Sequence, residues 1–160
     1  MSKMYGLSGQ FRVFWLVFAL LAVLMAQLPV ARAGSIYPLI TSDPDRKAVL
    51  NALRPAVEAS MNGPVRFLVH TISSYERRWA FVVADPQRPG GHRIDPKKTR
   101  FRHDIEFMDG LTVFALLRFA DGRWNLIDHH VGPTDVSYAA WPSQYGVPAA
   151  LLGLSAEANQ

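Results

Sequence analysis

Apolar residues between positions 44 and 61 recur every three or four residues, the spacing that places side chains on one face of an α-helix. Asp43 is a favourable N-cap, Pro44 suits the first helical position, and the Asn-Gly-Pro sequence at 62–64 is a typical helix end. Pro55 lies inside the pattern and removes a backbone donor, so we expect a kink or a break there. The sequence predicts an amphipathic helix from Asp43 to Met61 whose apolar stripe is Val49, Leu50, Leu53, Val57 and Met61.

From residue 66 onward the period changes to two, which is typical of strands with one buried face. β-Branched and aromatic residues are frequent in these stretches, and turn residues separate them. Asp121-Gly122 is a strong signal for a two-residue hairpin. The pattern predicts strands over residues 66–73, 79–84, 101–107, 111–119 and 123–131, and then a tail with a short helical turn that packs on the body.

One helix followed by antiparallel strands predicts an α+β fold, in which a curved sheet of four or five strands packs over the helix. This order of elements is that of a cystatin-like or nuclear-transport-factor-2-like roll, in layout only. A closer resemblance rests on the segments RKAVLNALRPAVE, GPVRFLV, WAFVVADPQRP, DGLTVFALLRFADGRWNLIDH, VGPTDV and YGVPAALLG. Together they resemble a family of small exported bacterial proteins without an assigned activity. The resemblance implies export and a compact α+β domain, and it assigns no functional residue.

The first 33 residues have the pattern of a secretory signal peptide. Lys3 and Arg12 supply a positive start, residues 13–26 are apolar and uncharged, and the Ala-Arg-Ala sequence at 31–33 suits a signal peptidase. The apolar stretch is shorter than the roughly 20 residues of a membrane-spanning helix, although an uncleaved anchor is the alternative. We predict cleavage after Ala33, which leaves residues 34–160 as a single exported domain, periplasmic or secreted.

Charge and cysteine content narrow the function classes. Residues 34–160 carry fourteen Lys and Arg against thirteen Asp and Glu, so the formal charge of +4 for the whole chain falls to +1. This balance predicts neither nucleic-acid binding nor membrane binding after cleavage, and the locally basic stretch 88–103 is interpreted as a solvated loop. The chain has no cysteine, which excludes disulfides, thiolate metal sites and cysteine nucleophiles. No cofactor and no metal site is predicted.

Asp128 and His130 form the candidate functional pair. A two-residue hairpin at 121–122 would place Asp128 opposite Ala115 and His130 opposite Val113, on one otherwise apolar face of the sheet. A carboxylate beside an imidazole can orient it and make it a usable base. The alternative is structural, because the pair lies at the strand end far from the turn, where polar side chains reach water.

Asp104, Glu106 and His70 are three further polar candidates. Asp104 and Glu106 share a face and could bind a hard cation, but Arg102 beside them favours ion pairs at a solvated edge. His70 alternates with apolar neighbours and is interpreted as a core or rim residue.

Histidine and aromatic residues near the C-terminus complete the list of candidates. His129 is expected on the face opposite His130, across from Phe114, so the two histidines are a poor pair of zinc ligands. Trp141 and Tyr145 could line a binding surface, because amphipathic aromatic side chains suit contacts, or they could anchor the tail.

Two functions from different classes follow. The favoured one is a non-catalytic exported module that binds a partner protein or a small ligand, with Asp128, His130, Trp141 and Tyr145 as ligand-binding candidates. The alternative is a small hydrolase or lyase in which Asp128 orients His130 as the general base. An enzyme requires both side chains to converge in a concave pocket, whereas a binding module can leave them at an exposed rim.

Overall fold

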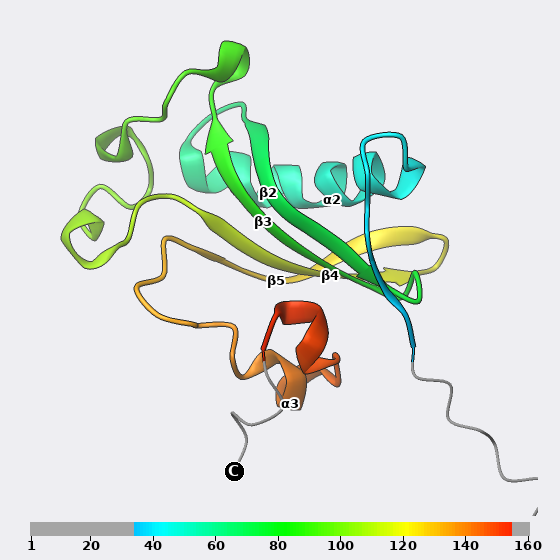
Figure 1. Cartoon of the computed structure of the whole chain (residues 1–160). Coiled ribbons are helices and arrows are strands. Elements are labelled where there is room, and N and C mark those ends of the chain that lie inside the picture. Colours follow the sequence, from blue (N-terminus) through cyan, green and yellow to red (C-terminus); the bar gives the residue numbers. More distant parts are fainter. Residues whose placement is uncertain (1–33, 155–160) are drawn as a thin grey trace, which may run out of the picture. The chain divides into compact units, whose positions relative to one another are not determined.

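The predicted helix forms as α2 (Pro44–Met61) in the computed structural model, which describes residues 34–154 (Figure 1). Asp43 is its N-cap, and the Asp43 carboxylate accepts a hydrogen bond from the backbone N–H of Asp45 at 2.9 Å. The helix continues through Pro55 without a break, so the predicted break is wrong, whereas the predicted kink stays a prediction. Pro55 and Asn51, whose carbonyl loses its donor, are both exposed, and water can therefore replace the missing hydrogen bond.

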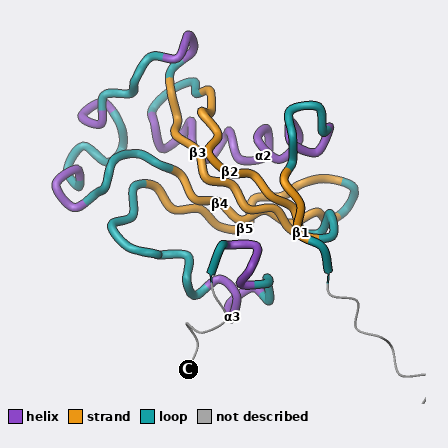
Figure 2. The backbone as a smooth tube through the Cα atoms, in the orientation of Figure 1, coloured by secondary structure: helices purple, strands orange, loops and turns teal. Residues whose placement is uncertain are grey.

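Five antiparallel strands form one sheet in the order of the chain, which confirms the α+β fold class. At the predicted hairpin, Asp121 and Gly122 have positive φ angles of 54° and 73°, as a two-residue type I′ turn requires. Each strand pairs with the next along the chain (Figure 2), and the strands are β1 (Ile36–Pro38), β2 (Arg66–Tyr75), β3 (Trp79–Gln87), β4 (Val113–Ala120) and β5 (Arg123–Val131).

The strand predicted over residues 101–107 does not form. These residues belong to the connection between β3 and β4, which contains the short 3₁₀ turns η1 (Pro89–Gly91), η2 (Pro96–Lys98) and η3 (Ile105–Phe107). The alternating pattern does not reflect a buried face here, because Phe107 is 77% exposed. β3 and β4 pair with each other and leave no position between them, and β1 is the fifth strand instead.

The inner face of the sheet, which faces α2, carries the main core. Val49, Leu53 and Val57 of the helix are each 0% exposed, and they pack with inward-facing strand residues such as Ala115 and Leu117. The helical stripe therefore packs against the sheet as predicted. β4 and β5 form the expected antiparallel pair, although β5 lies at the edge of the sheet and not at its centre.

An ion pair between the buried Asp45 and the exposed Arg77 connects the start of α2 to the turn between β2 and β3. Asp45 is 8% exposed, and its carboxylate accepts hydrogen bonds from the Arg77 guanidinium at 2.6 and 3.0 Å. The indole N–H of Trp124 on β5 donates to the same carboxylate at 3.3 Å. The first turn of the helix is thereby fixed against the β2–β3 turn and against β5.

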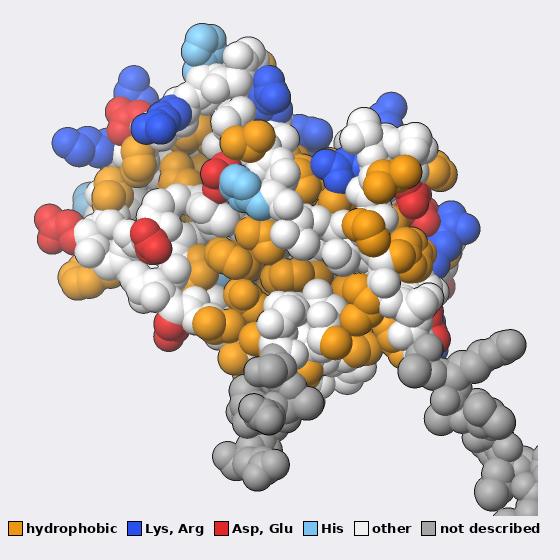
Figure 3. Space-filling view, viewed as in Figure 1, with side chains coloured by type: hydrophobic (Ala, Val, Ile, Leu, Met, Phe, Trp, Pro, Cys, Tyr) orange, Lys and Arg blue, Asp and Glu red, His pale blue; other side chains and the backbone are white. Residues whose placement is uncertain are grey.

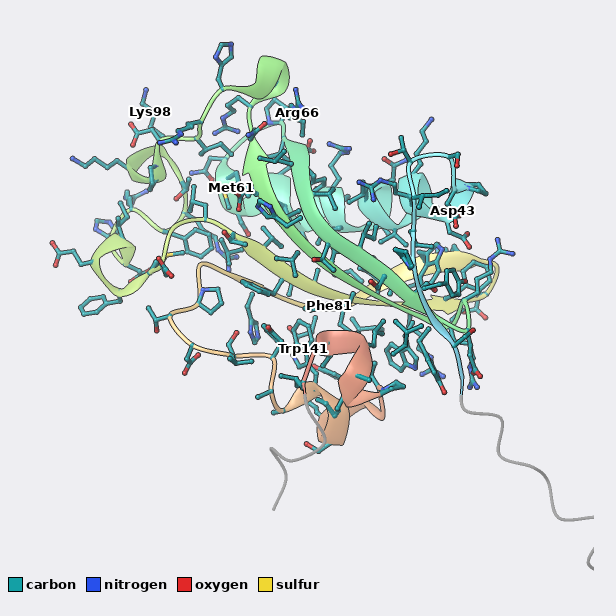
Figure 4. All side chains as sticks on the ribbon, in the orientation of Figure 1. Asp43, Met61, Arg66, Phe81, Lys98 and Trp141 are labelled. Carbon is teal, nitrogen blue, oxygen red and sulfur yellow. The ribbon has the colours of Figure 1, made fainter. Side chains whose placement is uncertain are left out.

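The outer face of the sheet, opposite α2, is covered in part by residues 137–154, here called the C-terminal segment. It contains α3 (Trp141–Tyr145) and η4 (Ala149–Leu152), and lies below the sheet in Figure 1. Trp141 is 1% exposed and packs edge-on against Phe81 of β3, with 6.3 Å between ring centroids (Figure 4). The tail thus packs on the body through its aromatic residues, as predicted.

The predicted signal peptide, residues 1–33, lies outside the described residues. Among the helices of residues 34–154, none is long and apolar enough to cross a membrane. Export and cleavage stay predictions.

Candidate functional site

A β-bulge in β5 changes the predicted register. Leu117 faces Leu126, as the two-residue hairpin requires, but the next pair is Leu116 and Asp128. Ile127 is therefore an extra residue on β5 with no partner on β4. From Asp128 onward, the pairing of β5 with β4 is therefore displaced by one residue from the predicted register.

The bulge moves Asp128 and His130 together to the outer face. His130 lies opposite Phe114 and not opposite Val113, and Asp128 no longer faces Ala115. The predicted placement on the face of Ala115 and Val113 is wrong, because a shift of one residue moves every following side chain to the other face. Since both residues follow the bulge, they still share one face with each other.

The carboxylate of Asp128 holds the C-terminal segment against the sheet. Its Oδ2 accepts a hydrogen bond from the indole N–H of Trp141 at 3.1 Å and one from the hydroxyl of Tyr145 at 2.8 Å. Its Oδ1 accepts the backbone N–H of His129 at 2.7 Å. Both carboxylate oxygens are thus occupied by donors from the protein itself.

His130 lies beside this cluster without a direct hydrogen bond to Asp128. Its Nε2 is 3.9 Å from Asp128 Oδ1, beyond hydrogen-bond distance, and its Nδ1 is hydrogen-bonded to the hydroxyl of Ser137. The imidazole also packs against Trp141, with 5.3 Å between ring centroids, and the side chain is 32% exposed. The structure therefore brings together all four candidate residues: Asp128, His130, Trp141 and Tyr145.

The hydrogen bond between Tyr145 and Asp128 also affects the titration of the phenol. Donation of its hydroxyl hydrogen bond to Asp128 raises the pKa of Tyr145 above its ordinary value of 10.0, so the phenol stays protonated at neutral pH. The Asp128 carboxylate is correspondingly engaged by Tyr145 and Trp141 and does not orient the imidazole of His130.

His129 points to the inner side of the sheet, opposite Ala115 rather than Phe114. Burial lowers the pKa of His129 below 6.5, and the positive charge of Arg100 lowers it further, so the imidazole is neutral at neutral pH. His129 and His130 lie on opposite faces and cannot converge on one metal ion. No group of three or more His, Asp or Glu side chains within residues 34–154 is arranged to hold a metal.

Asp104 and Glu106 are exposed in the connection between β3 and β4 and do not lie on a strand. The ion pairs expected with Arg102 are not found among the described residues. The Arg102 guanidinium instead donates a hydrogen bond to the ring of His103 at 2.9 Å. These two carboxylates thus form neither a shared site nor a salt-bridged edge.

A second polar cluster on the sheet was not found by the sequence analysis. His70 Nε2 lies 2.8 Å from Asp85 Oδ2, and the hydroxyl of Thr112 donates to Asp85 Oδ1 at 2.7 Å. His70 sits at a bulge in β2 and its side chain is 47% exposed, so it is a rim residue and not a core residue. The charged Asp85 in the otherwise largely apolar β3 is the sequence feature that could have indicated this cluster.

The contacts of Asp85 predict a measurable pH dependence. Burial acts to raise the pKa of Asp85, but the hydrogen bonds from Thr112 and His70 outweigh it and lower the pKa below 3.8. A lowered folded-state pKa gives stability that is present above the unfolded-state pKa and is lost as pH falls through the folded-state pKa. Thr112→Val should therefore move the Asp85 carboxyl titration, followed by NMR, to higher pH. An unchanged titration midpoint would contradict the hydrogen bond between Thr112 and Asp85. Asp104→Asn, which changes an exposed carboxylate outside this cluster, is the control.

No family model matches the chain, and no curated protein or solved structure is significantly similar to it. The resemblance to small exported bacterial proteins stays a prediction. The likeness to cystatin-like rolls rests on the order of the elements alone.

Proposed function

We propose that residues 34–160 form an exported, non-catalytic binding module whose binding surface is the outer face of the sheet beside the C-terminal segment. The observation that carries this proposal is that Asp128 accepts hydrogen bonds from Trp141, Tyr145 and the His129 amide. The alternative function requires Asp128 to orient His130 through a hydrogen bond, but His130 Nε2 is 3.9 Å from Asp128 Oδ1, and the imidazole is hydrogen-bonded to Ser137 instead. The cluster acts as a fixed anchor that shapes the neighbouring surface.

The surface beside the anchor is apolar and partly open. Val83 of β3 lies between Thr71 of β2 and Phe114 of β4 on the outer face, and both Val83 and Phe114 are half-buried. Tyr138 stacks on Phe114, with 5.1 Å between ring centroids, and forms the border with the C-terminal segment. Figure 3 shows hydrophobic side chains gathered in the middle of this face. An apolar or aromatic group fits such a surface better than a charged one.

Polar side chains flank this apolar strip at its two ends. His130 of β5 lies opposite Phe114, and the His70–Asp85 pair lies on the β2 and β3 side. With neighbouring strands about 4.8 Å apart, β2 and β5 are separated by roughly 14 Å, the width of a drug-sized molecule or a short peptide segment. We expect a ligand with an aromatic or apolar centre and a hydrogen-bonding group at one end or both.

The proposal is tested by protein-observed NMR with a library of small aromatic acids, amines and amides. Binding should shift the amide signals of Val83, Phe114 and Thr71, and leave those of the α2 residues unchanged. Phe114→Ala should weaken the response to the same compounds at least several-fold, because it removes the aromatic centre of the strip. Ile40→Ala, which removes an exposed side chain outside the outer face, is the matched control.

Two results would contradict the proposal. Shifts scattered over the surface, or unaffected by Phe114→Ala, would show that the outer face is not a binding surface. Turnover of chromogenic ester, phosphoester or glycoside substrates that His130→Ala abolishes would establish catalysis in place of simple binding.

Export makes a separate prediction. If the first 33 residues are a signal peptide, the protein recovered from the periplasm or the medium should begin at Gly34, as determined by mass spectrometry of the intact chain. A chain in the membrane fraction that still begins at Met1 or Ser2 would support an uncleaved anchor.

A further inference from the structure

The charge of the described residues is strongly segregated. Residues 88–103, here called the basic segment, contain six Lys and Arg and one Asp, whereas the rest of residues 34–154 contains eight Lys and Arg and eleven Asp and Glu. The basic segment thus carries a formal charge of +5 and the remainder −3. The expectation of no membrane binding rested on the net charge and on the interpretation of residues 88–103 as a solvated loop, and net charge does not reflect this separation.

One of the six cations has a structural role. The Arg88 guanidinium donates to the carbonyl of Met61 at 2.7 Å and to that of Pro64 at 3.2 Å, at the C-terminal end of α2. The other five form no salt bridge to a carboxylate within the residues that the structure describes. They are all exposed, and they are Arg93, Lys97, Lys98, Arg100 and Arg102.

The basic segment is held in a defined conformation. Thr99 is 0% exposed, and its hydroxyl donates a hydrogen bond to the carbonyl of Pro96 and accepts one from the N–H of Phe101. The N–H of Arg100 donates to the carbonyl of Ser60 on α2 at 3.1 Å. The cations are therefore displayed from a scaffold that is fixed to the helix, and Figure 4 shows Lys98 in the connection that follows β3.

We propose that the basic segment binds the surface of a membrane that contains anionic phospholipids. Five exposed cations without carboxylate partners match the clusters of four to eight Lys and Arg that bind such surfaces. Fixed positions reduce the entropy lost when the side chains contact headgroups. This surface is distinct from the outer face of the sheet and the inference does not depend on the proposed function.

An exposed aromatic side chain favours a lipid surface over a soluble polyanion. Phe107, in the same connection between β3 and β4, is 77% exposed, more than any other large apolar residue in the described part. The exposure of this apolar side chain to water is unfavourable, and the side chain can enter the headgroup region of a bilayer instead. Asp104, Glu106 and Asp109 flank it and oppose binding to anionic lipid, so neutralising them should strengthen binding.

The chain lacks cysteine, so a single introduced cysteine can report the contact without background. A polarity-sensitive dye on His92→Cys in the full chain should brighten with vesicles of phosphatidylcholine and phosphatidylglycerol, but not with phosphatidylcholine alone. The same dye on Ser143→Cys, in the C-terminal segment, should not respond. Reading the dye at His92 separates this contact from any binding by residues 1–33.

Charge variants measure the contribution of the segment. Replacing Lys97 and Lys98 by Gln should weaken the vesicle affinity measured with the dye at His92→Cys about 30-fold, because each cation removed lowers the affinity about fivefold. Lys47→Gln with Arg123→Gln removes the same charge elsewhere and should have a much smaller effect. Raising the salt from about 0.1 to about 1 M shortens the Debye length from about 10 to about 3 Å and should abolish the response.

Three results would overturn the inference. These are equal dye responses at His92→Cys and Ser143→Cys, equal effects of the two charge pairs, and binding that is insensitive to salt. In a separate variant, Phe107→Ser should also weaken vesicle binding. Circular dichroism checks that each variant is folded. Tighter binding to polyphosphate or DNA than to vesicles, unaffected by Phe107→Ser, would assign the segment to a soluble polyanion instead.

Discussion

Replacing Leu53 by alanine should lower the free energy of unfolding by about 2–5 kcal/mol. Leu53 is 0% exposed in the middle of α2 and packs in the core between the helix and the inner face of the sheet. The substitution removes buried methyl groups, and the two flanking residues Val49 and Val57 are themselves fully buried and limit collapse around the cavity. Urea unfolding at equilibrium, with the slope unchanged between the proteins, measures the loss.

Ile40→Ala is the matched control, because Ile40 is 62% exposed and its truncation should change stability by no more than about 0.5 kcal/mol. A loss below about 0.5 kcal/mol for Leu53→Ala would mean that the helix does not pack against the sheet through this stripe. A changed slope would indicate that the denatured state or the two-state transition had changed instead.

The sequence predicted the elements whose signals are local. The spacing of apolar residues and the Asp43 cap determine the helix, and both are found as predicted. The hairpin at Asp121-Gly122 also formed with the predicted turn type, because both positions adopt the positive φ angles that few other residue pairs accept. The break predicted at Pro55 does not occur, because the cost of a proline depends on whether the unpaired carbonyl of Asn51 reaches water, and this depends on burial.

The register beyond the hairpin could not be predicted. Counting outward from the turn places Asp128 correctly only if no residue is inserted, and Ile127 is inserted. A bulge at an isoleucine carries no local signature comparable to the glycine of a turn. The contacts that accompany this register are long-range, because Trp141 and Tyr145 donate to Asp128 from a segment that follows the sheet.

The false strand over residues 101–107 has a similar cause. The alternation of Phe101, Ile105 and Phe107 with polar residues satisfies the rule for a half-buried strand. A strand also needs a partner with free backbone groups, and β3 and β4 already pair with each other. Periodicity reports the side chains of a segment and contains no information on which strand edges remain available.

Asp128→Asn should release the C-terminal segment from the outer face and lower the free energy of unfolding by about 1.5–3 kcal/mol. The substitution preserves shape but removes the charge, and an amide has one acceptor oxygen where the carboxylate has two. The Asp128 side chain is only 27% exposed, so water does not readily replace the lost partner of the Trp141 indole N–H at 3.1 Å. Asp135→Asn, at an exposed position before the C-terminal segment, is the matched control and should be neutral.

The titration of Tyr145 distinguishes release of the segment from a general loss of stability. Because the hydrogen bond to Asp128 raises the pKa of Tyr145, the Asp128→Asn protein should titrate this phenol at lower pH, closer to 10.0. The fluorescence of the tryptophans should shift to the red as Trp141 becomes solvated, and an apolar dye should bind the uncovered side chains of Phe81 and Leu116. If stability, the Tyr145 titration and fluorescence are all unchanged, apolar packing alone holds the segment. Asp128 would then again be available to act on a ligand or on His130.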